Sequence, residues 1–377
     1  MFLFLCLALI LNHRVGYISL IGVFSVVFLL KHSLNTKFDI GIFILAMYLL
    51  LYYAFSSFNG FRFTISTAVL YVLAPIPFYL FGKYLVQKYK YDNWIIIAWF
   101  IIIVCYCFDV YIVTIQNIFE SGQLVSESRE FYLSHSEQSQ LSATLVGLHA
   151  DIGMVGLLMF VVMKNRVLRY SFLALFLLSL ITTLSLLNRT GIIIALVSFF
   201  SVIVYKYRKT PQKIVYSIFI LGFILTALFY FNVINTELLE MYNERNADLY
   251  TMGDRSDKWA EAIRSLFISP LGWADLSESY YVHNMWLDIA RVSGVIPFIL
   301  LVYITFDSLC KSFFLVRRRG NELSYMLLGL NICFFTSCFV EPIYGGTHFM
   351  LYCMLWGTVR ELKKQEFSIV HGTVMLC

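Results

Sequence analysis

The sequence predicts an all-α membrane protein, a polytopic bundle of about 12 transmembrane helices with one large helical extracytoplasmic loop. Three observations predict it: the composition, a series of long apolar segments, and an uneven distribution of lysine and arginine. Of 377 residues, 60% are hydrophobic and only 14% are charged. A soluble domain is nearer one-quarter charged, so apolar runs in this background indicate a bilayer.

The apolar segments set the expected number of spans, because a spanning helix needs about 17–25 residues. We expect them at 1–12, 16–30, 40–57, 66–82, 94–115, 141–163, 171–188, 191–205, 214–234, 295–315, 323–340 and 346–360. The first is short, so the count falls to 11 if it does not cross. It has no basic region and no small-residue cleavage site, which indicates a retained anchor. One membrane domain results, with N-terminal helices in 1–234, the large loop in 235–294, and C-terminal helices with a tail in 295–377.

Lysine and arginine predict the orientation, because cytoplasmic connections carry an excess of both. Alternate connections hold 19 of the 28: Lys31, Lys37, Lys83, Lys88, Lys90, Lys164, Arg166, Arg169, Lys206, Arg208, Lys209, Lys213, Lys311, Arg317, Arg318, Arg319, Arg360, Lys363 and Lys364. The other nine are Arg14, Arg62, Arg129, Arg189, Arg245, Arg255, Lys258, Arg264 and Arg291. The Lys-rich side is therefore expected to be cytoplasmic, with both termini inside and the large loop outside. Eight of the nine outer cations are arginine, whose planar fork binds phosphate bidentately; chance or base composition is the alternative explanation of this bias.

Several classes of function are disfavoured. No basic tract with interleaved aromatics is present, so we expect no nucleic acid partner. The eight cysteines lie outside the large loop and, except for Cys377, in or beside apolar segments, as expected of buried side chains. Neither a metal-ligand cluster nor a phosphate-cradling glycine loop is evident, and we expect no metal and no cofactor.

The large loop has the features of a site. A helix is expected to begin near Arg255 and run to about Phe267, with an apolar, packed face made of Trp259, Ala262, Ile263, Leu266 and Phe267. The backbone N–H groups of its first turn and the Arg255 guanidinium favour an anion. The alternative is a surface arginine. A helix-ending turn follows at 269–272.

Two further residues are candidates. His283 is expected near the start of the helix that re-enters the membrane, where the helix dipole favours a neutral, proton-accepting imidazole. Arg189 lies at an outer tip between two apolar segments, and arginine at membrane depth is costly unless it is paired. A capping role for His283 and snorkelling of Arg189 to the interface are the alternatives. Weaker candidates are Arg291, Glu341 and His348, which could line the same cavity, and His149, Asp151 and Asp109, interpreted as packing or interfacial residues.

Four short motifs occur along the chain in an order that resembles a known family. They are Asn188-Arg189-Thr190-Gly191, Arg255 followed by Trp259, Pro270-Leu271-Gly272, and His283-Asn284. Together they resemble the superfamily of O-antigen ligases and O-antigen polymerases, bacterial inner-membrane glycosyltransferases. The motifs cover roughly residues 185–297, and the preceding spans match only in number and character.

The resemblance implies an inverting, metal-independent transfer on the periplasmic face. A polyprenyl-diphosphate-linked oligosaccharide would be the donor, Arg189 and Arg255 would hold its diphosphate, and His283 would accept the proton of the acceptor sugar hydroxyl. Membrane lipids and a chain-length regulator protein are the other expected partners.

The first interpretation is a polymerase of lipid-linked repeats for O-antigen or capsular polysaccharide. The alternative closest to it is a ligase that transfers the glycan to lipid A-core, which shares every motif. A flippase or other transporter is a different class, disfavoured because the ionisable residues concentrate at the outer surface and not within mid-membrane spans. A non-catalytic partner in polysaccharide assembly would tolerate substitution of Arg189, Arg255 and His283.

Overall fold

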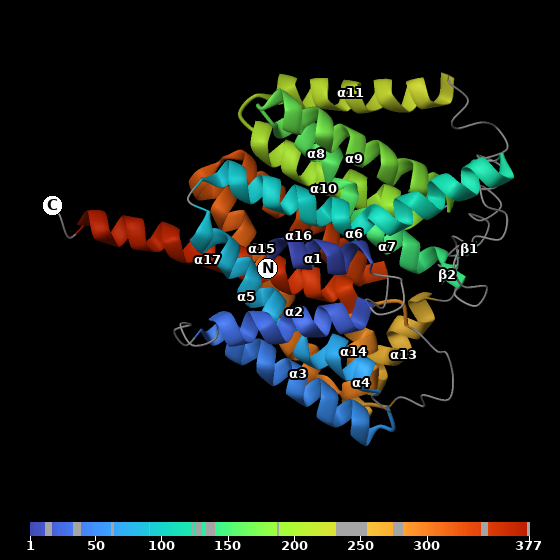
Figure 1. Cartoon of the computed structure of the whole chain (residues 1–377), viewed down its shortest axis with the longest axis vertical. Coiled ribbons are helices and arrows are strands. Elements are labelled where there is room, and N and C mark those ends of the chain that lie inside the picture. Colours follow the sequence, from blue (N-terminus) through green and yellow to red (C-terminus); the bar gives the residue numbers. More distant parts are fainter. Residues whose placement is uncertain are drawn as a thin grey trace. The chain divides into compact units, whose positions relative to one another are not determined.

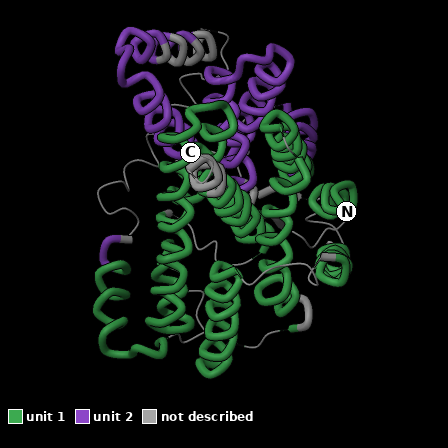
Figure 2. The backbone as a smooth tube through the Cα atoms, turned by 90° about the vertical axis from the view of Figure 1, so that its left-hand side faces the viewer, with its two compact units in different colours: residues 1–109, 258–377 green, residues 110–257 purple. Residues whose placement is uncertain are grey.

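The computed structural model describes most of the chain. The described residues are 1–11, 17–32, 39–61, 64–89, 91–122, 124, 130–132, 140–186, 188–230, 255–273, 282–340 and 346–374. The first part of the expected large loop, 235–254, and its segment 274–281 lie outside them, so the extent of the loop stays a prediction. The chain divides into two compact units, 1–109 with 258–377 and 110–257 (Figure 2).

The protein is a helical membrane protein. Among the described residues, seven helices are long and apolar enough to cross a bilayer: Ile40–Phe58, Val69–Lys88, Asp92–Ser121, Arg166–Ser185, Thr190–Tyr207, Val295–Arg319 and Glu322–Phe339. Each of the 12 expected segments contains helix among the described residues, although 141–163 begins in a strand and several of the helices are shorter than a full span. A total of about 12 spans stays a prediction.

The first unit contains both ends of the chain. Its elements are α1 (Phe2–Ile10), α2 (Tyr17–His32), α3 (Ile40–Phe58), α4 (Ile65–Ala68), the π-helical turn η2 (Val69–Leu73), α5 (Pro75–Lys88), the first part of α6 (Asp92–Ser121), most of α13 (Arg255–Ile268), α14 (Met285–Ser293), α15 (Val295–Arg319), α16 (Glu322–Val340) and α17 (Gly346–Val374) (Figure 1). The short helix α14 packs against α3, α15 and α16.

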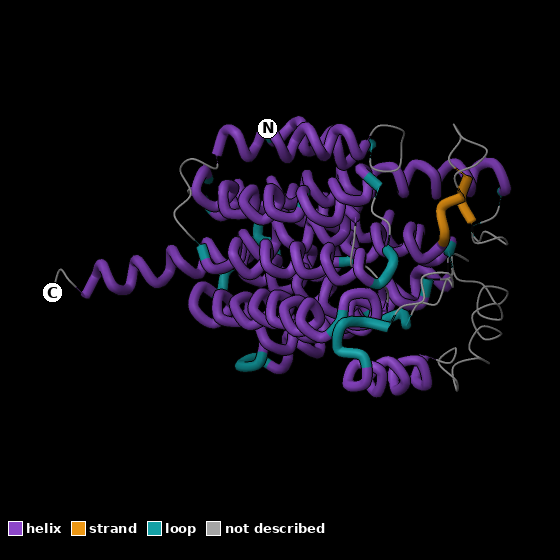
Figure 3. The backbone as a smooth tube through the Cα atoms, turned by 90° about the horizontal axis from the view of Figure 1, so that it is seen from below, coloured by secondary structure: helices purple, strands orange, loops and turns teal. Residues whose placement is uncertain are grey.

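The second unit contains the rest of α6 and the helices that follow it. Its elements are β1 (Glu130–Tyr132), β2 (Gln140–Ser142), α7 (Ala143–Gly153), α8 (Val155–Val162), α9 (Arg166–Ser185), α10 (Arg189–Tyr207) and α11 (Pro211–Tyr230). The two strands pair antiparallel, with Phe131 opposite Leu141, and α7 follows β2 directly (Figure 3). The segment expected as one span at 141–163 is thus two helices that meet at Met154.

Glycines allow the closest helix pairing in the first unit, between α5 and α17. A Cβ atom placed on Gly82 would lie 2.0 Å from the Met354 carbonyl oxygen, and one placed on Gly357 would lie 2.0 Å from that of Tyr79. Small residues at such crossings let backbones approach and are typical of membrane helices. Between α15 and α16, Asn331 accepts a hydrogen bond from Ser308 at 2.6 Å and donates to Ser312 at 2.8 Å, a polar link within the apolar core.

Candidate functional site

Parts of three of the four motifs that carry the resemblance meet around α14 in the first unit: Trp259, the turn at Pro270, and His283-Asn284. Asn284 caps this helix, because its side chain accepts the Leu287 N–H at 3.2 Å. All nine residues of α14 are buried. The sequence led us to expect a helix that continues into the next span, but Gly294, at φ +82°, separates α14 from α15.

His283 lies immediately before the cap in an unusual backbone conformation. Its φ is +54°, and among the described residues it is the one non-glycine residue with a positive φ. The left-handed region is uncommon for residues with a Cβ, and it persists only where the surroundings impose it. Here the buried Asp288 carboxylate accepts the Val282 N–H at 3.0 Å and the Asn284 N–H at 3.3 Å. One carboxylate therefore holds the backbone on both sides of His283.

Helix α13 anchors the same segment from the other side. The Trp259 indole N–H donates to the Val282 carbonyl oxygen at 2.9 Å. On the apolar face expected for this helix, Ala262 and Leu266 are buried, and Ala262 packs with Val282 in one cluster. Ile263 and Phe267, expected on the same packed face, are exposed. The helix therefore buries one side of its apolar face and leaves the other side open.

The predicted turn at 269–272 forms and packs on the junction of α14 and α15. The Gly272 N–H donates to Ser269 at 3.0 Å, and Gly272 has φ +107°. The Pro270 carbonyl accepts the Val295 N–H at 2.8 Å, so closely that a Cβ on Gly294 would lie 2.3 Å from that oxygen. Asn59, the C-cap of α3, donates to the carbonyls of Leu271 at 2.8 Å and Val292 at 3.0 Å.

Asp288 also forms an ion pair with Arg291, whose Nε lies 3.7 Å from Oδ1. Burial raises the pKa of the Asp288 carboxyl, and the two backbone N–H donors and Arg291 offset only part of that increase. Arg291, a candidate for lining a cavity, is itself buried, and its carbonyl accepts the Trp273 N–H at 2.9 Å. In this position it counters the Asp288 charge and ties the turn to α14.

Replacing Asp288 with Asn is expected to lower the thermal unfolding midpoint of the purified protein. An amide has one acceptor oxygen, so at least one of the N–H groups that flank His283 loses its carboxylate partner. Leaving such a buried group unpaired costs about 1–3 kcal/mol. The midpoint is measured in detergent at neutral pH.

The pH dependence gives a second readout. Because folding raises the pKa of Asp288, ionisation opposes folding. The contribution of Asp288 to the stability of the folded protein is complete below the unfolded-state pKa, and it is lost as the pH rises through the folded-state pKa. Asp288→Asn should lack this decline, whereas Asp257→Asn, at an exposed position near the start of α13, should behave as wild type. Equal midpoints for wild type and Asp288→Asn at every pH would show that the carboxylate does not support this backbone.

The fourth motif lies in the second unit, at the start of α10. Asn188 caps this helix by accepting the Thr190 N–H at 3.1 Å. The motif packs against α7: a Cβ on Gly147 would lie 2.1 Å from Asn188 Nδ2, and one on Gly191 would lie 2.5 Å from Asp151 Oδ1. Asp151 is buried. A buried carboxylate thus lies beside the first turn of α10, where the sequence indicated only packing or an interfacial residue.

The proposed catalytic and diphosphate-binding residues are divided between the two units. His283 belongs to the first unit, and Arg189 and Arg255 belong to the second. Arg189 and Arg255 are the first residues of α10 and α13, but their side chains lie outside the described part of the structure. The placement of His283 relative to either guanidinium stays a prediction.

The remaining candidates fall in different surroundings. Glu341 lies outside the described residues. His348 is buried in the helix packing of the first unit, where its Nδ1 lies 3.1 Å from the Tyr106 hydroxyl and its ring meets the Phe334 ring edge to face. Its part in a cavity stays a prediction.

Two residues of the site were not singled out from the sequence. Asp288 follows Asn284 by one helical turn, and this spacing could have suggested a carboxylate that folds back on the preceding loop. Asn59 is 212 residues from Leu271, and no local pattern indicates that pairing. Both side chains form hydrogen bonds with backbone groups, and neither hydropathy nor the order of the motifs indicates such bonds.

Comparison of the sequence with known protein families finds no match, and comparison with curated proteins finds none either. The function is therefore inferred from the local geometry and from the order of the motifs.

Proposed function

We propose that this protein is a bacterial inner-membrane glycosyltransferase that polymerises lipid-linked oligosaccharide repeats, as in O-antigen or capsule synthesis. The donor is an oligosaccharide on polyprenyl diphosphate, and the acceptor is a sugar hydroxyl of a second lipid-linked glycan. Transfer takes place at the periplasmic face. The Lys-rich connections and both termini lie in the cytoplasm.

One observation carries the proposal: parts of three separate motifs pack around α14, and the residue before its cap, His283, has a constrained backbone. Trp259 binds the carbonyl before His283, Asp288 accepts the N–H groups on both sides of it, and the Pro270 turn packs where α14 ends. Holding a non-glycine residue in a left-handed conformation costs free energy, and such strain clusters at functional sites. A capping role alone does not call for it, because Asn284 already caps α14.

The helix lengths support the proposed sidedness. Asn59, at one end of α3, contacts the turn beside α14, and Asp39 caps the other end. The 19 residues of α3 span about 29 Å at 1.5 Å per residue, which is close to the thickness of a bilayer's hydrocarbon core. The site around His283 is thus about one membrane thickness from the other end of α3, where Asp39 pairs with Lys83 and Arg360.

In the proposed reaction, the acceptor hydroxyl oxygen attacks the anomeric carbon of the donor sugar. A new carbon–oxygen bond forms as the bond to the diphosphate oxygen breaks, with inversion at that carbon. His283 accepts the hydroxyl proton and later releases it to water. Arg189 and Arg255 hold the diphosphate, and their charge stabilises the negative charge that develops on the leaving oxygen. The products are the lengthened glycan and polyprenyl diphosphate.

Deletion of the gene tests the proposal through the glycans that the cell makes. A polymerase deletion is expected to leave surface glycan with a single repeat unit on its acceptor, because donors are still made but cannot be joined. Electrophoresis and mass spectrometry of the surface glycan measure the chain length. Re-expression of the wild-type chain should restore long chains.

Each other phenotype indicates a different function. Unmodified lipid A-core with accumulated lipid-linked polymer would indicate a ligase. Lipid-linked single repeats trapped on the cytoplasmic side would indicate a flippase. Normal chain length and quantity in the deletion strain would contradict every one of these assignments.

A further inference from the structure

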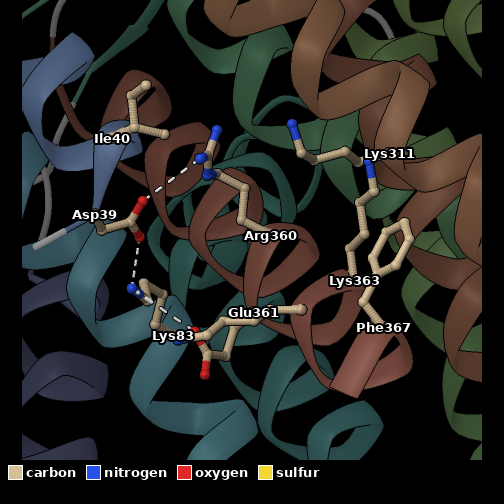
Figure 4. A pocket seen from close by; sticks show the side chains of 9 residues that line it. Asp39, Ile40, Lys83, Lys311, Arg360, Glu361, Lys363 and Phe367 are labelled. Carbon is tan, nitrogen blue, oxygen red and sulfur yellow. Dashed lines mark hydrogen bonds and ion pairs between the residues drawn. The ribbon is translucent and has the colours of Figure 1, made fainter. Parts of the chain in front are cut away.

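A cationic cavity lies at the end of α3 opposite the site around His283. It has a volume of about 480 Å³ and is lined by Asp39, Ile40, Lys83, Lys311, Arg360, Glu361, Lys363, Lys364 and Phe367. These residues come from the start of α3, from α5, and from the C-terminal halves of α15 and α17 (Figure 4). The cavity lies entirely within the first unit.

Ion pairs fill one side of this cavity. Asp39 lies between Lys83, at 2.5 Å, and Arg360, at 3.4 Å (Figure 4). Lys83 is also 3.7 Å from Glu361. Burial raises the pKa of Asp39, but the hydrogen bonds from Lys83 and the Gly41 N–H outweigh it, so the pKa is lowered and the carboxylate stays ionised.

A third carboxylate completes the network. Asp307 pairs with Arg360 at 3.0 Å and with Lys311, and it accepts the Trp356 indole N–H at 2.7 Å. The cavity is lined by five cations, Lys83, Lys311, Arg360, Lys363 and Lys364, and by the carboxylates of Asp39 and Glu361. Cations therefore outnumber carboxylates among the residues that line the cavity.

Lys311 and Lys363 come from α15 and α17, on one side of the cavity. Lys363 lies 5.1 Å from the centre of the Phe314 ring and 5.4 Å from that of Phe367, and ring faces do not neutralise an ammonium. In Figure 4, Lys311 and Lys363 lie across the cavity from Asp39. An ammonium carries three donors, and lysine is a common point-charge ligand of phosphate.

Apolar side chains border the cations. Ile40 is 57% exposed and Phe367 is 46% exposed, and both line the cavity. The cavity is at one end of a helix that is about as long as the bilayer core is thick, so it lies at headgroup depth. Basic pockets between membrane helices on the cytoplasmic side are suited to anionic headgroups.

We propose that this cavity binds a phosphate-bearing anion, with the headgroup of an anionic phospholipid as the source that the apolar border favours. The lysine ammonium groups donate to the phosphate oxygens, and Ile40 and Phe367 contact the adjoining lipid. This site is separate from the proposed transfer site, so failure of either proposal leaves the other standing.

The test is lipid binding by the purified full-length chain in a neutral detergent. Phosphatidylglycerol, phosphatidylcholine and inorganic phosphate are the probes, and bound lipid is counted by native mass spectrometry alongside the thermal unfolding midpoint. We expect phosphatidylglycerol to bind wild type more tightly than phosphatidylcholine does. A variant with Lys363→Gln and Lys364→Gln should bind it about fivefold more weakly for each lysine removed.

Matched variants separate charge at this cavity from general charge. Lys88→Gln is the control, because Lys88 lies five residues after Lys83 in α5, is exposed, and also lies over tyrosine rings. It should bind as wild type does, and replacing Lys363 and Lys364 with arginine should restore binding. If the double variant does not fold, Lys363→Gln alone serves.

The outcomes are distinct. Preference for phosphatidylglycerol that depends on Lys363 and Lys364 supports a lipid ligand. Stabilisation by inorganic phosphate alone, lost in the same variant, supports the site with a soluble phosphate as its ligand. Equal binding of every probe by the folded wild type and double variant would overturn the proposal.

Discussion

Replacing His283 with Asn is expected to lower the rate of glycan transfer about 100- to 10,000-fold, the usual contribution of a general base. Asparagine is the informative substitution, because it tolerates the left-handed conformation at φ +54° and cannot serve as the base. The folded structure should therefore be retained while the chemistry is lost. Complementation of the deletion strain measures this as loss of long-chain glycan at equal protein level.

A companion variant separates the base from the backbone. His283→Ala removes the imidazole. Alanine, unlike asparagine, has no polar side chain to stabilise the left-handed conformation, so this variant should lose both activity and some stability. If His283→Asn supports normal chain length and quantity, His283 is not the base, and its conformation serves the architecture alone.

The second large effect is expected at the arginines. Arg255→Ala and Arg189→Ala should each lower the transfer rate about 100- to 1,000-fold, by analogy with loss of one preorganised donor to a developing negative charge. Arg→Lys keeps the charge but loses the fork that binds phosphate oxygens in pairs, so its activity should lie between wild type and Ala. Rates with a lipid-linked donor, measured on purified variants, are compared with that of wild type.

Arg264 provides the matched control. It lies in the same helix as Arg255 and is exposed, and Arg264→Ala should transfer glycan at the wild-type rate. Full activity of both Arg189→Ala and Arg255→Ala would exclude them as diphosphate ligands, and a membrane partner without catalysis would become the better interpretation.

The helical membrane class could be predicted because long apolar segments indicate membrane helices, and seven described helices are long and apolar enough to cross a bilayer. Every apolar segment expected from the sequence contains helix among the described residues. The breaks could not be predicted in the same way. Gly294 was visible in the sequence, but its role depends on the Pro270 carbonyl, which approaches too closely for any Cβ. Such a contact between distant residues leaves no periodic signal.

The candidate site was predictable in part for a related reason. Trp259, the turn at Pro270 and His283 could be selected as motifs, and the structure brings these three together. Asp288 was not singled out because its role is to accept backbone N–H groups. Nearly every residue has such a group, so the sequence does not show which ones Asp288 binds. The cavity beside Lys83 could not be predicted in this way, because in the sequence its five cations indicate only sidedness.

Glycan transfer by the purified protein tests the central claim most directly. The full chain, reconstituted in lipid nanodiscs, would be incubated with an oligosaccharide repeat on polyprenyl diphosphate, and the products separated by chromatography and mass spectrometry. We expect longer lipid-linked saccharides, with one polyprenyl diphosphate released for each transfer, and both products formed about 100- to 10,000-fold more slowly with His283→Asn. An unchanged substrate after incubation with folded wild-type protein, with or without lipid A-core as acceptor, would contradict it.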